Sequence, residues 1–99
     1  MTNDEVIDLV FRELGAAEVK HPGWPVDPVH AAAILGEEAG ELLQAALDFT
    51  YQGGNFELGR MKKEAAQCAA MGIRFLMGFD RYERAINNQR ALIRMKEKP

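Results

Sequence analysis

Residues 29–51 read VHAAAILGEEAGELLQAALDFTY, and this stretch decides the fold class. Its apolar residues recur at intervals of three and four, which is the period of an α-helix and not of a β-strand. Asp27 is a suitable N-cap in front of the stretch, and Gly53 is a typical residue just beyond a helix end. The sequence therefore predicts one long helix over about residues 29–51.

The rest of the chain gives no sign of a strand, because alternating runs of Val, Ile and Thr are missing. The segment HPGWPVDP at 21–28 contains three prolines, so it is predicted to be an ordered loop. Further helices are expected over residues 3–18, over residues 55–79 with Asn55 as cap, and from Asp80 towards the end of the chain. The predicted fold class is all-α, with a single domain over residues 1–99 shaped like a four-helix bundle.

The two central helices, over residues 29–51 and 55–79, each carry apolar residues on two sides. In the first of them, Ile34 and Leu42 fall on one side, whereas Leu43 falls on the other. Four short helices cannot cover both sides of both central helices within one subunit. The sequence therefore predicts a homo-oligomer, and the alternative is a loosely packed monomer whose small residues only reflect composition.

Composition excludes several classes of protein. The 99 residues are 47% apolar and 27% charged, a globular balance that excludes intrinsic disorder. One cysteine cannot form an intrachain disulfide, and no apolar run approaches the roughly 18 residues of a membrane span. The net charge of −3 argues against binding to duplex DNA. Since the N-terminus is acidic and unlike a signal peptide, we expect a cytoplasmic protein that binds neither a membrane nor nucleic acid directly.

Acidic residues occur where the helical pattern leads one to expect apolar residues. Glu38 lies in the middle of one apolar side of the first central helix, Glu41 lies near the edge of that side, and Glu64 lies centrally in the second. A carboxylate buried alone is costly or takes up a proton. A divalent cation such as Mg²⁺ or Mn²⁺ relieves that cost, because both ions prefer oxygen ligands. The alternative is that these glutamates are solvated and paired with Arg60 or Lys63.

The sequence Glu37-Glu38-Ala39-Gly40-Glu41, followed after 22 residues by Glu64-Ala65-Ala66-Gln67, resembles a known signature. It is similar to the EExxE…ExxD pattern of the MazG-like, all-α nucleoside triphosphate pyrophosphatases, and the similarity covers about residues 20–80. The resemblance implies Mg²⁺-dependent hydrolysis of a nucleoside triphosphate to the monophosphate and pyrophosphate. It also implies dimers or tetramers of helical bundles and a house-cleaning role towards non-standard nucleotides or deoxynucleotides.

By this resemblance, the metal ligands are Glu38, Glu41, Glu64 and Gln67, and the catalytic residues are Glu37 and Glu38. Gln67 departs from the signature, which has Asp at this position. An amide oxygen still binds a cation but carries no negative charge. The alternative function is therefore a catalytically impaired MazG-like protein that binds nucleotide or metal, or an oligomeric interaction protein encoded by a phage or mobile element.

The resemblance also suggests substrate-binding residues. Related pyrophosphatases place aromatic residues for base stacking just before the EExxE helix, where this chain has Trp24 within its proline-rich loop. The other explanation of Trp24 is that it seals the end of the bundle. The full set of predicted substrate-binding residues is Trp24, His21, His30, Lys63, Asn88 and Arg90.

Overall fold

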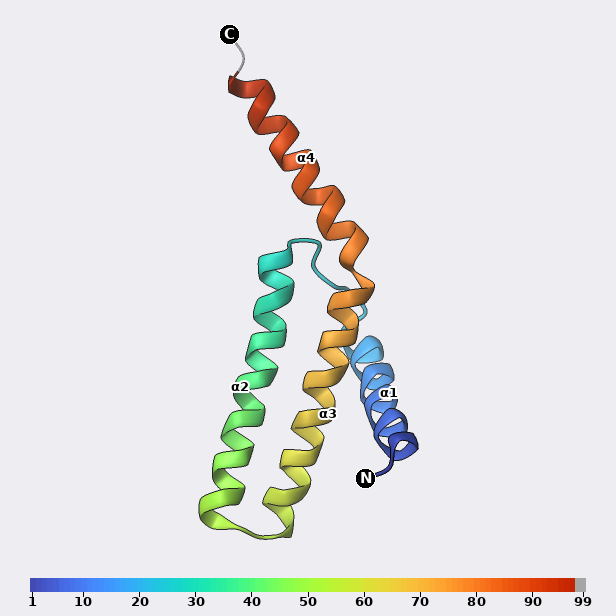
Figure 1. Ribbon diagram of the computed structural model, residues 1–99, viewed down its shortest axis with the longest axis vertical. Coiled ribbons are helices and arrows are strands. Elements are labelled where there is room, and N and C mark those ends of the chain that lie inside the picture. Colours follow the sequence, from blue (N-terminus) through green and yellow to red (C-terminus); the bar gives the residue numbers. More distant parts are fainter. Residues whose placement is uncertain (98–99) are drawn as a thin grey trace.

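The computed structural model describes residues 1–97, which form four helices and no strand (Figure 1). The helices are α1 (Asn3–Lys20), α2 (Pro28–Gln52), α3 (Asn55–Met77) and α4 (Phe79–Glu97). The all-α prediction is confirmed, and so is the loop between the first two helices.

The ends of α2 follow from the sequence. The Asp27 side chain caps the first turn by accepting a hydrogen bond from the backbone N–H of Val29. At the other end, Gly53 and Gly54 have φ angles of 71° and 97°. Glycine adopts these left-handed values without steric cost, which allows a short turn into α3.

The caps predicted for α3 and α4 are wrong. The N-cap of α3 is Gly54, and Asn55 is already the first helical residue. Asp80 lies inside the first turn of α4, which begins at Phe79. In both cases a glycine, Gly54 or Gly78, directly precedes the helix. Each helix therefore begins at or before the residue that was predicted to cap it.

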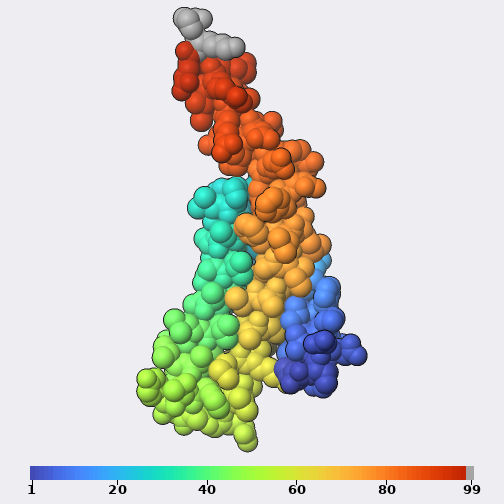
Figure 2. All heavy atoms as spheres, viewed as in Figure 1, coloured from blue at the N-terminus to red at the C-terminus, as the bar shows by residue number. Residues whose placement is uncertain are grey.

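Helices α2 and α3 run antiparallel side by side, and α1 packs against α3 (Figure 1). Helix α4 continues beyond the end of α3 instead of folding back, so only three helices of this chain form a bundle (Figure 2). The predicted four-helix bundle is thus not completed within one subunit. The reason is the connection: Gly78 alone separates α3 from α4, whereas antiparallel helix neighbours need about 2–8 linking residues.

The resulting shape is elongated and its core is thin. The chain measures 66 × 28 × 23 Å, and its radius of gyration is 17.9 Å, against about 13 Å for a compact domain of this length. Its accessible surface is 7286 Å², against about 5,600 Å² for a compact monomer of the same mass. The buried apolar residues are mostly small: Leu14, Ala31, Ala45, Ala66, Ala70, Met71 and Tyr82.

Many large apolar side chains remain exposed. Leu43 and Leu47 lie on the outer side of α2 with 62% and 42% of their surface exposed. On α4, Leu92 and Ile93 are 58% and 49% exposed. Apolar surface of this extent is unusual for a monomer and typical of an interaction site. Within residues 1–97, no helix combines the length and the apolar character that crossing a membrane requires.

Candidate metal centre and its pocket

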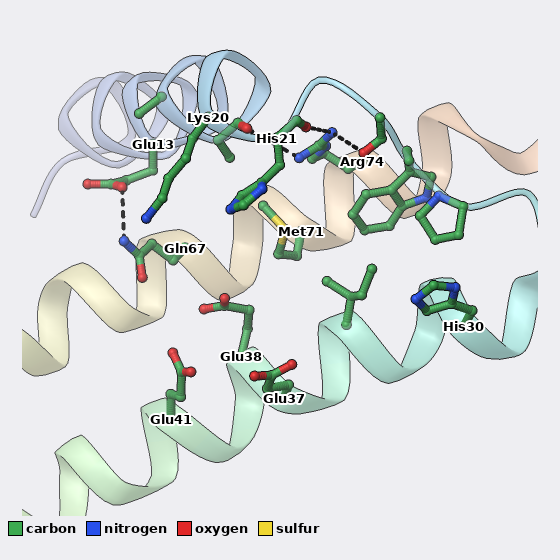
Figure 3. Close-up of a pocket in the computed structure, with 16 residues that line it drawn as sticks. Glu13, Lys20, His21, His30, Glu37, Glu38, Glu41, Gln67, Met71 and Arg74 are labelled. Carbon is green, nitrogen blue, oxygen red and sulfur yellow. Dashed lines mark hydrogen bonds between the residues drawn. The ribbon is translucent and has the colours of Figure 1, made fainter.

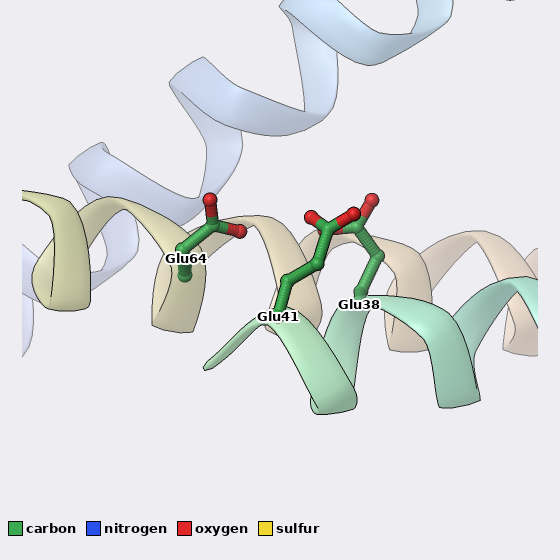
Figure 4. Close-up of side chains that lie close together, drawn as sticks. All are labelled: Glu38, Glu41 and Glu64. Carbon is green, nitrogen blue, oxygen red and sulfur yellow. The ribbon is translucent and has the colours of Figure 1, made fainter. Parts of the chain in front are cut away.

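Three carboxylates from two helices meet near the middle of the bundle. Glu38 and Glu41 project from adjacent turns of α2, and Glu64 projects from the facing side of α3 (Figure 4). One carboxylate oxygen from each lies within 4.8 Å of the others. We call these residues the acidic triad. The structure thus brings together three of the four residues predicted as metal ligands.

The triad contains carboxylate oxygens that nothing in the described chain satisfies. Within residues 1–97, one oxygen of Glu38 and one of Glu64 are buried without any hydrogen-bond donor. Burial raises the pKa of Glu38, and the charges of Glu41, Glu64 and Glu37 raise it further. Burial likewise raises the pKa of Glu64, and Glu41 adds to the effect. The three carboxylates therefore carry a cost of desolvation and mutual repulsion that no donor within residues 1–97 relieves at these two oxygens.

The triad fits a hard divalent cation. Three carboxylates supply oxygen ligands of the kind that Mg²⁺ and Mn²⁺ prefer, and they leave positions for water or phosphate oxygens. A cation between Glu38 and Glu64 would satisfy both of the buried oxygens. It would also reduce the mutual repulsion of the three carboxylates.

The predicted alternative, in which the glutamates pair with basic residues, finds little support within residues 1–97. Arg60 forms its ion pair with Asp48 on α2, not with Glu64. Lys63 makes no ion pair, although its charge and that of Arg60 partly offset the rise in the pKa of Glu64. Glu38 and Glu64 are half-buried and not fully solvated.

Gln67 lies one turn beyond Glu64 and makes a contact that the sequence did not predict. Its side-chain amide donates a hydrogen bond to Oε2 of Glu13 on α1, with 3.3 Å between nitrogen and oxygen. Helix α1 contains five acidic residues. The sequence therefore gave no reason to select Glu13 from among them. Only the packing of α1 against α3 brings Glu13 to this place.

A pocket of about 680 Å³ extends from the triad towards the proline-rich loop (Figure 3). This volume is typical of a small-molecule site. Glu37, Glu38 and Glu41 line its acidic end. Trp24 and Ile34 line the more apolar end, at the loop and the start of α2. We call this cavity the main pocket.

The substrate-binding predictions divide into two groups. Trp24, His21 and His30 all line the main pocket. Asn88 and Arg90 do not line it; they are exposed on α4. Since α4 continues beyond α3 (Figure 1), a single chain does not bring these two residues to the main pocket, and their role in substrate binding stays a prediction. Lys63 is also exposed and outside the lining of the main pocket, although it lies beside the triad.

Trp24 is fixed by contacts on two sides. Its indole N–H donates to the hydroxyl of Tyr82 on α4, at 2.5 Å. The guanidinium of Arg74 lies 4.8 Å from the centre of its ring. Since Trp24 also lines the main pocket, it seals the junction of α3 and α4 and still forms part of the pocket wall.

Arg74 anchors the loop that carries Trp24. It is 7% exposed, and it donates to the carbonyl oxygens of His21 at 2.7 Å and Gly23 at 3.3 Å. It also donates to the carbonyl of Ala17 near the end of α1, at 3.5 Å. A buried guanidinium matches several carbonyl oxygens at once because its donors form a rigid fork.

Lys20 is a pocket residue that the sequence analysis missed. It lies in the last turn of α1, and its ammonium group points into the main pocket on the side opposite Glu37 and Glu38 (Figure 3). Within residues 1–97 no carboxylate lies within ion-pairing distance of it. A basic residue at a helix C-terminus is common, so the sequence alone gave no reason to select Lys20.

Comparisons with known proteins add no further support. No protein-family model, no curated protein and no solved structure matches the chain. The MazG-like resemblance therefore depends on the signature residues themselves, and membership of that family stays a prediction.

Proposed function

We propose that this protein is an Mg²⁺-dependent nucleoside triphosphate pyrophosphohydrolase, which converts a ribo- or deoxynucleoside triphosphate to its monophosphate and pyrophosphate. The observation that carries the proposal is the acidic triad, with its two buried and unpaired oxygens, at the end of a pocket of nucleotide size. The signature formed by residues 37–41 and 64–67 supports the same function.

In this proposal Glu38, Glu41 and Glu64 hold the cation, together with the amide oxygen of Gln67. Bound there, Mg²⁺ would supply positive charge against the phosphate chain and would make a water molecule at the site more acidic. Glu37 lines the main pocket beside Glu38 and orients the attacking water as a hydrogen-bond acceptor. Water adds across the anhydride between the α- and β-phosphates, and pyrophosphate leaves.

The opposite end of the main pocket suits the base and sugar. Trp24 presents a flat apolar surface that its contacts with Tyr82 and Arg74 hold in place, which suits base stacking. His30 and His21 line the same end and offer polar contacts. The phosphate chain would then extend from the sugar, near Trp24, to the cation at the acidic triad.

Lys20 is a better candidate than Lys63 for a contact with phosphate, because Lys20 lines the main pocket and Lys63 does not. We expect Lys20→Ala to weaken binding of a non-hydrolysable triphosphate about ten-fold at saturating Mg²⁺, the loss of one charged contact. Calorimetric titration measures this effect. Lys62→Ala, which removes an exposed lysine of α3 outside the pocket, is the matched control. Equal affinities of the two variants would contradict the role of Lys20.

The test of the activity is hydrolysis of a panel of ribo- and deoxynucleoside triphosphates with Mg²⁺ or Mn²⁺, with identification of both products. Glu38→Gln is the control for contaminating enzymes, because it keeps the shape of the side chain and removes its charge. Formation of monophosphate and pyrophosphate by the wild type alone supports the proposal. Release of inorganic phosphate, or equal activity of the variant, contradicts it.

A second function is favoured by one observation, the neutral amide at position 67 and its bond to Glu13. With one carboxylate fewer than the signature, the site would bind metal and nucleotide without efficient turnover. Tight binding of a triphosphate with Mg²⁺, without products, would favour this reading. The protein would then be a nucleotide-binding or interaction protein of the same shape.

We also propose that the protein is a homo-dimer or homo-tetramer, since the outer side of α2 and much of α4 expose large apolar residues. Sedimentation of the wild type at micromolar concentration should give the mass of two or four chains. Leu43→Glu should shift that mass towards the monomer, because it introduces a charge in the exposed apolar side of α2. Val19→Glu, at an exposed site on α1, is the control. A monomeric wild type would refute the proposal.

A further inference from the structure

We infer that Glu13 is a positioning residue for the metal centre: it holds the side chain of Gln67 so that the amide oxygen, and not the amide nitrogen, faces the cation. The inference rests on the proposed function, since it concerns the same Mg²⁺ site. It assigns a role to a residue of α1 that lies outside the signature.

The hydrogen bond between the two side chains fixes the direction of the amide. Gln67 Nε2 lies 3.3 Å from Glu13 Oε2. An ionised carboxylate only accepts hydrogen bonds, so the NH₂ end of the amide must face Glu13. The carbonyl oxygen then points the other way. Figure 3 shows the nitrogen of Gln67 turned towards Glu13 and its oxygen turned to the side of Glu38.

The direction of this amide matters because Gln67 borders the triad. Residues three apart in a helix lie on the same side, so Gln67 projects from α3 beside Glu64. It also lines the main pocket together with Glu38 and Glu41. An amide oxygen is a good ligand for a hard cation, whereas the NH₂ group in the same place would repel it.

The pairing also gives a physical reason for glutamine at position 67. Glu13 needs a hydrogen-bond donor opposite it, and a carboxylate at position 67 would offer only a second negative charge. The amide satisfies both neighbours at once, since it donates to Glu13 and leaves its oxygen for the cation. On this account Gln67 fits the site because α1 places Glu13 beside it.

The test is a double-mutant cycle on Mg²⁺ affinity, measured without nucleotide from the rise of Tm with Mg²⁺ concentration. Glu13→Ala should weaken Mg²⁺ binding about ten-fold, the usual effect of removing a residue that orients a ligand. Gln67→Ala should weaken it at least as much. If Glu13 acts through Gln67, then Glu13→Ala adds no further loss in the Gln67→Ala protein. Alanine suits a helical position such as 13, so the fold is preserved.

Glu18→Ala is the matched control, because it removes one exposed negative charge from the same helix outside the main pocket. Its Mg²⁺ affinity should equal that of the wild type. The inference would be overturned if Glu13→Ala left the Mg²⁺ affinity unchanged. It would also be overturned if Glu13→Ala caused the same loss of affinity in the wild type and in the Gln67→Ala protein, since that result indicates a general effect of charge. A wild type that neither binds Mg²⁺ nor hydrolyses nucleotides would instead refute the proposed function.

Discussion

Glu38→Gln should make the metal-free protein more stable and at the same time abolish its response to Mg²⁺. In the absence of metal, Glu38 is a half-buried carboxylate with an unpaired oxygen, close to two other carboxylates. The glutamine keeps its size and removes the charge, so desolvation and repulsion both fall. We expect Tm to rise by a few degrees without metal, and hydrolysis to fall about 100-fold or more, beyond the usual loss from a residue that only orients a ligand.

The same change should alter the dependence of stability on pH. The folded state raises the pKa of Glu38 and Glu64 above the ordinary value of 4.5. The folded protein therefore binds these protons more tightly than the unfolded chain does. Stability without metal should fall as the pH rises from about 4.5 through the folded-state pKa values, and saturating Mg²⁺ should offset the fall.

Thermal unfolding with EDTA and with Mg²⁺, across this pH range, measures both effects. Glu38→Gln should show a smaller fall with pH and no stabilisation by Mg²⁺. Glu57→Gln is a suitable control, because Glu57 is an acidic residue of α3 outside the triad and the main pocket. A Glu38→Gln protein that is less stable than the wild type without metal would show that the triad is not under strain.

Arg74→Ala should destabilise the fold by about 2–4 kcal/mol, the largest effect that we expect outside the triad. The substitution removes three hydrogen bonds that a buried guanidinium donates to the carbonyl oxygens of Ala17, His21 and Gly23. It also removes the contact with the ring of Trp24. The loop that carries Trp24 and His21 should become mobile, so nucleotide affinity should fall as well.

Chemical denaturation at a fixed protein concentration measures this loss, and quenching of Trp24 fluorescence reports on the loop. Arg74→Lys should fall between the wild type and the alanine variant, since an ammonium lacks the planar fork that serves several carbonyls. Arg84→Ala, which removes an exposed arginine of α4, should leave stability nearly unchanged. An alanine variant at position 74 as stable as the wild type would mean that the loop is held by other contacts.

The sequence was sufficient for the features that depend on local pattern. The helix over residues 29–51, the cap at Asp27 and the loop over residues 21–28 all follow from periodicity, side-chain capping and proline chemistry. The sequence also selected Glu38 and Glu64 as candidate metal ligands, because each interrupts an apolar side of its helix, and the structure brings them together.

Only the tertiary structure decided the features that depend on how the helices are directed. Gly78 is the only residue between α3 and α4, and α4 points away from the bundle (Figure 1). Asn88 and Arg90 therefore do not line the main pocket of their own chain. The packing of α1 on α3 brings Glu13 to Gln67 and points Lys20 into the main pocket. Helical periodicity fixes which side of a helix a residue occupies, but it does not fix which helix meets that side. A carboxylate on α1 therefore acquires its partner only when the chain has folded.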